Sequence, residues 1–186
     1  MATAAPREDW PRTVAEFQEW HARQPERWEF IDGWPRLMAP GSMKHSVIKS
    51  NVFRALHDVF RERGATVLVS GPQILTDEIS AIPDVVVTCT ALDLSTPAIA
   101  EPVVIVEVMS PSTEADDTGR KWLCYQRIPS LRHYLLLSQD KRLVQLHSRA
   151  GDLWRERFIE RGAVELDDPP VRLELDELYD GTEIAA

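Results

Sequence analysis

Residues 83–125 read PDVVVTCTALDLSTPAIAEPVVIVEVMSPSTEADDTGRKWLCY and contain two short, almost wholly apolar runs. These runs predict strands over residues 84–89 and 103–109. The second run is apolar on both faces, which is typical of a central strand in a sheet that is covered on both sides. Each strand carries one carboxylate, Asp84 in the first and Glu107 in the second. The fold, and any chemistry, are therefore expected to centre on these two strands.

Glu107 is the residue of this stretch that most needs a partner. Because side chains alternate along a strand, Ile105, Glu107 and Met109 share one face. An isolated carboxylate buried on that face would cost several kcal/mol. The sequence therefore predicts that Glu107 meets a cation, a hydrogen-bond donor or a metal ion. The alternative is that Glu107 lies close enough to the end of its strand to reach water.

Asp84 lies at the beginning of its strand. If the two strands are antiparallel neighbours, the start of the first lies beside the end of the second, and Asp84 and Glu107 come to the same edge of the sheet. Two carboxylates at one edge favour a hard divalent cation, which prefers oxygen ligands. The alternative is that Asp84 only fills a polar position in the turn after Pro83.

A helix is expected over residues 113–127, capped by Thr113. Within it, Asp117, Lys121 and Tyr125 recur at every fourth position and so share one face. Asp117 and Lys121 could form only a surface ion pair, worth a few tenths of a kcal/mol. The helix follows directly on the second strand, however, so the amine of Lys121 could also reach the end of that strand.

The rest of the chain supplies helices and strands on both sides of this stretch. Asp32-Gly33 between apolar runs is a strong hairpin signal, and Glu29 lies on the first strand of that hairpin. The expected elements are a helix over 13–23, a hairpin over 28–38, a long helix over 44–63, strands over 65–70 and 73–76, a hairpin over 132–148, and strands over 152–160 and 171–174. This order predicts an α/β (α+β) fold with a central mixed sheet flanked by helices.

The 186 residues carry a net charge of −9, and we expect one domain in which residues 1–12 are flexible. The charge is uneven, because residues 120–149 hold seven basic side chains against one acid, Asp140. This basic segment is compatible with a nucleic-acid groove or with an ordinary solvated surface. The seven are Arg120, Lys121, Arg127, Arg132, Lys141, Arg142 and Arg149.

Composition also bears on location. No apolar run approaches the ~20 residues that a membrane helix needs, and the first residues lack the basic start and apolar stretch of a secretory signal. Cys89 and Cys124 show neither metal-ligand spacing nor a disulfide framework, and both are expected to be buried free thiols. A cytoplasmic protein without membrane contact is expected.

Several of these residues together carry a family resemblance. Pro83-Asp84, then Glu107 at the start of EVMSPST, then the D-x-x-x-K-x-x-x-Y spacing at 117–125 resemble the Uma-two family of proposed bacterial restriction endonucleases. That family belongs to the PD-(D/E)XK, restriction-endonuclease-like superfamily. The similarity extends upstream through EFIDG at 29–33 and His45, and downstream through YLLL at 134–137.

The resemblance implies roles for these positions. Asp84 and Glu107 would be catalytic metal ligands, joined by the backbone carbonyl of Val108 and by Glu29, with Mg²⁺ or Mn²⁺ as the ion. The superfamily's usual lysine would stand at position 109, where this chain has Met109. Lys121 on the following helix matches the substitute catalytic lysine. The supporting positions are Glu29, Asp117, which orients Lys121, and His45 and Tyr125.

Two classes of function follow. The first is a metal-dependent nuclease that hydrolyses phosphodiester bonds, with DNA favoured, working as a homodimer because cutting two strands takes two sites. The second keeps the fold without turnover, because Met109 marks a degenerate site: a nucleic-acid-binding module, or a structural homo-oligomer in which the carboxylates and Lys121 form a buried ion network. The sequence does not identify the substrate, its recognition sequence or the biological pathway.

Overall fold

The structure is a computed structural model, and it describes residues 10–110 and 114–184. The helical elements are α1 (Val14–His21), α2 (Met43–Arg61), the π-helical segment η1 (Asp116–Lys121), α3 (Trp122–Tyr125) and α4 (Leu175–Leu178). The strands are β1 (Trp28–Ile31), β2 (Trp34–Leu37), β3 (Thr66–Val69), β4 (Gln73–Leu75), β5 (Ile79–Ala81), β6 (Val85–Thr88), β7 (Ala98–Ile99), β8 (Pro102–Met109), β9 (His133–Ser138), β10 (Val144–Ala150), β11 (Leu153–Ile159), β12 (Ala163–Asp167) and β13 (Pro170–Glu174).

The strands form two mixed sheets and a ribbon. The six-stranded sheet has the order β11-β10-β9-β8-β6-β3, in which β8 and β9 are the parallel pair. The five-stranded sheet has the order β2-β1-β5-β4-β7, and β12 pairs with β13 to form the ribbon. The α/β class with a mixed sheet is confirmed, whereas the sequence predicted one central sheet and the structure divides the strands between two.

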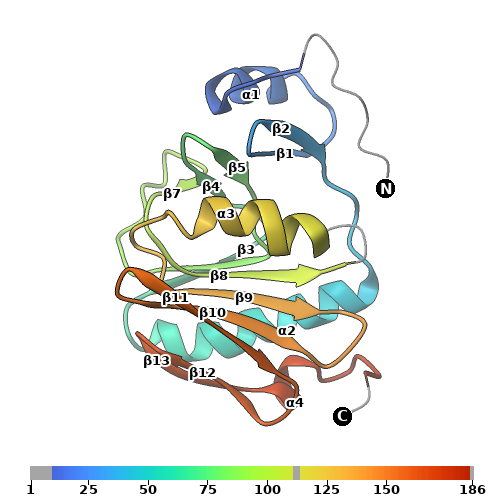
Figure 1. The fold of residues 1–186 in the computed structure, drawn as a ribbon, viewed down its shortest axis with the longest axis vertical. Helices are drawn as coiled ribbons and strands as arrows, with labels where there is room; N and C mark the ends of the chain where they lie inside the picture. The colour runs from blue at the N-terminus through green and yellow to red at the C-terminus, as the bar shows by residue number, and fades with distance from the viewer. Residues whose placement is uncertain (1–9, 111–113, 185–186) are drawn as a thin grey trace.

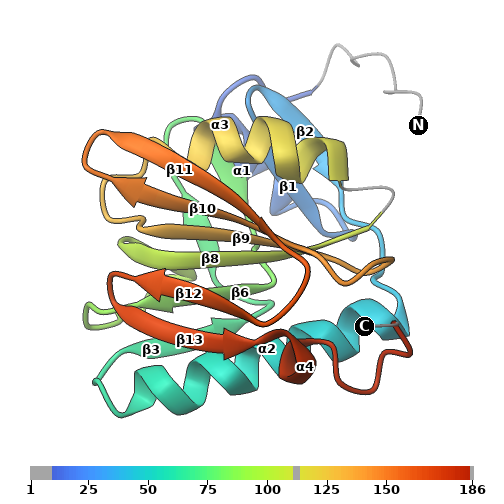
Figure 2. The same ribbon diagram turned by 60° about the horizontal axis from the view of Figure 1, so that its bottom comes forward.

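The six-stranded sheet is covered on both faces, as Figure 1 shows. On one face, side chains such as Val106 and Leu135 pack against α2, α4 and the ribbon β12–β13. On the other face, Ile105 and Leu136 pack against α3 and strands of the five-stranded sheet. Figure 2 shows the strands of the sheet side by side, with the ribbon next to α2. Strand β8 is therefore a central strand buried on both faces, as its apolar pattern predicts.

The N-terminal end of helix α2 lies near the C-terminal end of strand β8, as Figure 1 shows. The Ser42 side chain caps it by accepting a hydrogen bond from the His45 N–H, as expected for a serine at this position. Ile48, Val52 and Leu56 lie fully buried on one stripe of the helix. The stripe holds this long helix against the sheet and brings its first turns to the edge where β6 starts.

The N-terminal hairpin is held by aromatic packing and by its turn. Phe17 of α1 lies 5.4 Å from Phe30 of β1, measured between ring centroids. Asp32 and Gly33 both have positive φ, 49° and 82°, as the tight hairpin turn between β1 and β2 requires. The predicted hairpin is confirmed, and it places Glu29 on β1 with its side chain buried.

Three strands and one helix type differ from prediction. Strands β5 and β7 have only three and two residues, too few for periodicity to reveal, and β12 was not predicted. The helix expected over 113–127 is π-helical in its first half, and its expected cap, Thr113, lies outside the described residues. Cys89 is exposed, because the chain leaves the sheet just after Thr88, whereas Cys124 is buried as predicted.

The start of the described chain and one edge of the six-stranded sheet lie at the periphery of the fold (Figure 1). Residues 1–9 of the segment expected to be flexible lie outside the described residues, and Pro11 is buried. Strand β11 forms one edge of the six-stranded sheet and exposes Leu153 and Phe158, with Arg155-Glu156-Arg157 between them.

Within the two ranges that the structure describes, no helix combines the length and the apolar character needed to cross a bilayer.

The core prediction concerns Leu135, which is fully buried on β9 against the α2 face of the sheet. Leu135→Ala should lower the free energy of unfolding by about 2–5 kcal/mol, because it removes apolar contacts and leaves a cavity. Leu123→Ala on α3, where the side chain is half exposed, should change it by less than about 0.5 kcal/mol. Urea unfolding measures both, and equal losses would contradict this account of the core.

Candidate active site

A single ammonium group gathers three buried carboxylates. The Nζ atom of Lys121 lies 2.9 Å from Oε1 of Glu107, 3.2 Å from Oε2 of Glu29 and 3.2 Å from Oδ1 of Asp117. All four side chains are buried. Glu107 thus has the cation that its place in an apolar strand requires. The alternatives, that Glu107 emerges into water or that Asp117 and Lys121 form a surface pair, are wrong.

The carboxylates of this Lys121 cluster come from three elements. Glu107 lies on β8, two residues before its end, and Asp117 lies one turn before Lys121 on η1. Glu29 lies on β1 of the other sheet, where its Oε1 accepts a hydrogen bond of 2.9 Å from the backbone N–H of Ile82. The cluster therefore joins the two sheets and the helix between them.

Two tyrosines close the cluster on its apolar side. The hydroxyl of Tyr125 donates to Oε1 of Glu107 at 3.4 Å. Tyr125 is the last of the three residues that recur at every fourth position, and it thus contacts the same carboxylate as Lys121. The hydroxyl of Tyr134 on β9 donates to the backbone carbonyl of Asp117 at 3.1 Å. The two rings meet edge to face at 5.3 Å between centroids. The two buried tyrosine hydroxyls therefore help to hold β8, which carries Glu107, and η1, which carries Asp117, in place.

The cluster holds more negative than positive charge. Three carboxylates share one ammonium, so full ionisation would leave −3 + 1 = −2. Burial favours the neutral amine of Lys121, but the charges of Glu107, Glu29 and Asp117 outweigh it and raise the pKa of Lys121 well above its ordinary value. Burial raises the pKa of Glu107 well above its ordinary value, although Lys121 opposes the rise. Lys121 therefore stays charged, while Glu107 holds a proton more tightly than a carboxyl group in water.

Asp84 has a separate set of partners at the start of β6. Its Oδ2 lies 3.1 Å from Nε2 of His45 and accepts a 2.8 Å hydrogen bond from the backbone N–H of Val108, and its Oδ1 lies 3.7 Å from Nζ of Lys49. Burial alone would raise the pKa of Asp84, but His45, the Val108 N–H and Lys49 together lower it below its ordinary value. Asp84 is therefore an ionised carboxylate held by α2 and by the end of β8.

Strand register brings the two sets of residues to one edge. β6 and β8 are antiparallel neighbours, the condition under which the sequence places Asp84 and Glu107 at one edge, and Val85 pairs with Val106. Asp84 and Glu107 are the next residues along these strands, and the charge of Asp84 contributes to raising the pKa of Glu107. The alternative that Asp84 only fills a turn position does not account for its three partners.

The donors at this edge suit a hard divalent cation. The carboxylates of Asp84, Glu107, Glu29 and Asp117 supply oxygen atoms, which Mg²⁺ and Mn²⁺ prefer. Among the described residues, none donates a hydrogen bond to the buried Oδ1 of Asp117, although Nζ of Lys121 lies 3.2 Å away. As the described side chains lie, no three His, Cys, Asp or Glu groups converge as a ready-made metal site, since Lys121 stands among the carboxylates. The oxygen atoms and the negative charge of these carboxylates suit a divalent cation, and the ammonium of Lys121 competes with such an ion for them.

The π-helical geometry of η1 lies at the centre of the site. It spans Asp116–Lys121 and passes into α3 at Trp122. The hydroxyl of Thr118 donates to the backbone carbonyl of Glu114 at 2.6 Å, a side-chain bond that competes with regular helical pairing. Single π-helical turns occur frequently at functional sites, and here the turn presents Asp117 and Lys121 to Glu107.

The basic segment over 120–149, for which the sequence left open a nucleic-acid groove or an ordinary solvated surface, is dispersed in the fold. Lys121 is buried in its cluster, and Arg149 donates to the backbone carbonyls of Leu131, Gln126 and Ile128. Arg127, Arg132 and Arg142 each pair with a carboxylate, those of Glu78, Asp168 and Asp176. Adjacent charges along a chain point in different directions once strands and helices form.

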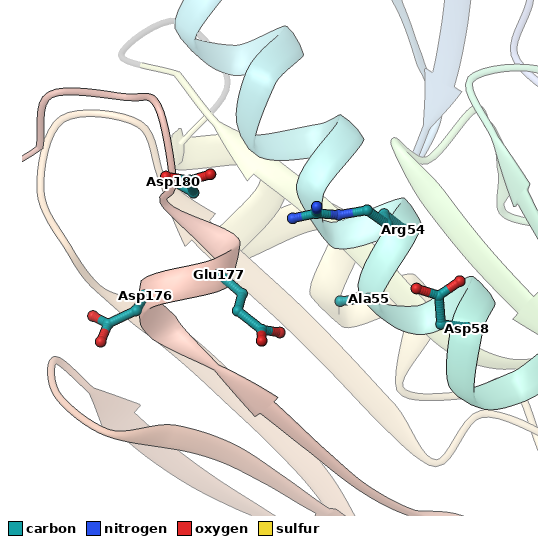
Figure 3. A pocket seen from close by; sticks show the side chains of 6 residues that line it. All are labelled: Arg54, Ala55, Asp58, Asp176, Glu177 and Asp180. Atoms are coloured by element: carbon teal, nitrogen blue, oxygen red, sulfur yellow. The ribbon is translucent and has the colours of Figure 1, made fainter.

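A hollow of about 410 Å³ lies between α2 and α4 (Figure 3). Its lining includes Asp58, Asp176, Glu177 and Asp180, with Arg54 as the cation. It shares no residue with the Lys121 cluster or with the partners of Asp84. Four carboxylates would repel a phosphate, so this hollow is not the place where a nucleic acid would meet the candidate site.

The structure adds two residues that the sequence did not single out individually. Lys49 contacts Asp84, and it follows His45 by four positions on the same helix, a spacing that would have indicated a shared face. Tyr134 supports Asp117 from β9, and only the YLLL resemblance pointed to its segment. The catalytic roles of all these residues stay predictions.

The fold of this chain matches that of a solved protein over nearly its whole length. A crystal structure described as that of "a putative nuclease belonging to DUF820" from Anabaena variabilis ATCC 29413 matches with a TM-score of 0.74 and 16% sequence identity. The match covers 92% of this chain and 99% of that chain. At this identity the likeness shows a shared fold.

The chain belongs to the Uma2 family, described as "Putative restriction endonuclease", whose profile matches residues 14–178. Two relatives come from Synechocystis sp. (strain ATCC 27184 / PCC 6803 / Kazusa). "Uncharacterized protein slr1290" is 37% identical over 158 residues, with 82% of each chain covered. "Uncharacterized protein sll1609" is 30% identical over 145 residues, covering 75% of this chain and 82% of the relative. The family resemblance inferred from residues 83–125 is confirmed.

The raised pKa of Glu107 predicts how stability depends on pH. The folded protein binds this proton more tightly than the unfolded chain, so the contribution of Glu107 is complete at low pH and is lost as the pH rises from about 4.5 through the raised pKa. Glu107→Gln cannot ionise, so its free energy of unfolding should fall less steeply than that of the wild type between about pH 5 and about pH 9.

Urea unfolding over that range measures the slope. Glu19→Gln, an exposed change on α1, is the control and should keep the wild-type slope. A Glu107→Gln slope as steep as that of the wild type would show that Glu107 is already fully ionised in the folded protein.

Proposed function

We propose that the protein is a metal-dependent nuclease that hydrolyses phosphodiester bonds of nucleic acid, with DNA as the favoured substrate and a homodimer as the working form. The observation that carries this proposal is the buried cluster of Lys121 with Glu29, Glu107 and Asp117 beside Asp84. Four carboxylates gathered near the end of β8 form an acidic site whose excess charge a divalent cation would balance. Family membership supports the reaction class.

Asp84, Glu107 and the backbone carbonyl of Val108 would hold Mg²⁺ or Mn²⁺, with Glu29 as a further ligand. When bound, such an ion lowers the pKa of a coordinated water and neutralises charge on a phosphate. The cluster offers these oxygens only after Lys121 shifts within it, because its ammonium now lies 2.9 Å from Glu107.

The protein's own groups supply positioning and charge. Lys121, kept charged by its carboxylate neighbours, would orient a water molecule or stabilise the negative charge that develops on the phosphate. Asp117 holds Lys121 in place from one turn away, and Tyr125 fixes Glu107 through its hydroxyl. His45 holds the carboxylate of Asp84 at the mouth of the site.

The second candidate is a non-catalytic module of the same fold, and Met109 is the observation that favours it. Met109 is buried on the same face of β8 as Glu107 and belongs to the apolar cluster there. No lysine can act from that position. In a binding module or a structural homo-oligomer, Lys121 would only neutralise buried carboxylates and would take no part in a reaction.

Calorimetry with Mn²⁺ separates the two candidates. The wild type should bind Mn²⁺ at millimolar concentration or below. Asp84→Asn and Glu107→Gln should each weaken binding at least about tenfold, since each removes a charged ligand. Asp58→Asn on the exposed side of α2 is the matched control and should leave binding unchanged. Absence of Mg²⁺, Mn²⁺ and Ca²⁺ binding at millimolar concentrations would favour the non-catalytic module.

Cleavage is tested with a panel of DNA and RNA substrates in Mg²⁺ or Mn²⁺. Glu107→Ala and Lys121→Ala should each reduce the rate at least about 100-fold, because each removes a group that stabilises the transition state. Glu114→Ala, an exposed change before η1, should retain the wild-type rate. Cleavage that survives both site changes would come from a contaminant or from a different site.

A further inference from the structure

We propose that Lys49 is a substrate-contacting residue that holds Asp84 in the metal-free protein and passes to a phosphate of the nucleic acid when Asp84 binds the metal. This inference rests on the proposed function and adds a route by which substrate reaches the site. Three observations carry it, and they concern access, the strength of the present contact and the charge at the start of α2.

Access to the site is uneven. The side chain of Lys121 is only 5% exposed and is surrounded by three carboxylates that are equally buried. A phosphate arriving from solvent would meet that negative charge before the ammonium. The side chains of Asp84, His45 and Lys49 are 15%, 13% and 22% exposed. The candidate site therefore opens to solvent on the α2 side, where Lys49 is more accessible than Lys121.

Lys49 makes the weakest of the contacts to Asp84. The Val108 N–H and His45 reach the Oδ2 atom at 2.8 and 3.1 Å, within hydrogen-bond range. Nζ of Lys49 lies 3.7 Å from Oδ1, which is an ion pair without a hydrogen bond. Partly exposed pairs of this kind contribute little to stability. Of the groups around Asp84, Lys49 is thus the one whose contact can be broken with the smallest loss of free energy.

The start of α2 is positively charged where a helix favours anions. The first turn of this 19-residue helix contains no acidic side chain and does contain one cation, Lys44. Helix N-termini are stabilised by negative charge, and cations there are unfavourable by themselves. A phosphate near this end would reverse the unfavourable interaction. Lys49 lies one turn after His45 and faces the same carboxylate.

The exchange follows from charge balance. A divalent cation on Asp84 neutralises the carboxylate that now pairs with Lys49. The ammonium then needs a new anion, and the phosphate beside the metal is the nearest one that the proposed reaction supplies. Metal and nucleic acid should therefore bind with positive coupling, each strengthening the other to the same extent.

The test compares Lys49→Met with Lys44→Met in the full chain. Lys44 is exposed and lies on a different side of α2, so its substitution removes the same charge from the same helix. Calorimetry measures Mn²⁺ affinity without nucleic acid. Fluorescence anisotropy measures binding of labelled DNA in Ca²⁺, used as a metal that slows cleavage, across a range of salt concentrations.

Lys49→Met should bind Mn²⁺ about two- to fivefold more tightly, because the competitor for Asp84 is gone. It should bind DNA more weakly, and the slope of the logarithm of the association constant against the logarithm of salt concentration should fall by about one, the signature of one lost phosphate contact. Lys49→Arg should restore DNA binding and the slope. Lys44→Met should leave Mn²⁺ affinity unchanged.

Contrary results are distinguishable. If the wild type binds Mn²⁺ and cuts DNA, but Lys49→Met keeps the wild-type Mn²⁺ affinity and salt slope, this inference fails and the proposed function stands. Equal changes in Lys49→Met and Lys44→Met also overturn it, since they reflect net charge alone. If the wild type neither binds Mn²⁺ nor cuts, both proposals fail together. Lys49→Gln repeats the measurement should Lys49→Met prove unfolded by thermal denaturation.

Discussion

The burial of one ammonium among three carboxylates is the constraint on which the rest of the structure depends. Lys121 can be buried only where Glu107, Glu29 and Asp117 meet it, and these residues come from both sheets and from the helix between them. Buried ion pairs are seldom a net source of stability, because desolvation offsets their attraction, whereas removing one partner costs about 3–5 kcal/mol. A cluster with surplus negative charge is harder still to explain by stability. Its cost is understandable if the fold maintains the cluster for chemistry.

The outline of this cluster could be predicted because its members violate local patterns. Glu107 interrupts an apolar strand, and a carboxylate there requires a partner wherever the strand lies. The i, i+4 spacing of Asp117 and Lys121 indicated one possible partner. The position of Asp84 beside Glu107 was expected only on the condition that the two apolar runs pair as antiparallel strands. Asp32-Gly33 fixed the hairpin that carries Glu29, although only the family resemblance connected Glu29 to the site.

Other features depend on contacts that no local pattern encodes. Strands β5 and β7 are too short to show periodicity, and their pairing with β4 assembles the second sheet from segments that look like loops. The π-helical turn at η1 has backbone hydrogen bonds that span one residue more than those of an α-helix, which the spacing of Asp117 and Lys121 does not reveal. The two interpretations of the basic segment, a nucleic-acid groove or a solvated surface, could not be separated for a related reason. Charge was counted along the chain, but Lys121 and Arg149 turn inward and three arginines pair with acids.

The exposed edge strand β11 limits how copies of this chain can assemble. Two-fold antiparallel pairing of identical strands is centred on a residue, because the symmetry axis is perpendicular to the sheet and keeps each side chain on its face. Centring on Arg155, Glu156 or Arg157 sets that charge against itself, and centring on Glu156 also sets Arg155 against Arg157. Like charges directly opposite one another are destabilising. The charged middle of β11 therefore disfavours edge-to-edge pairing of the sheets of two copies, although the apolar side chains of Leu153 and Phe158 near its ends are exposed.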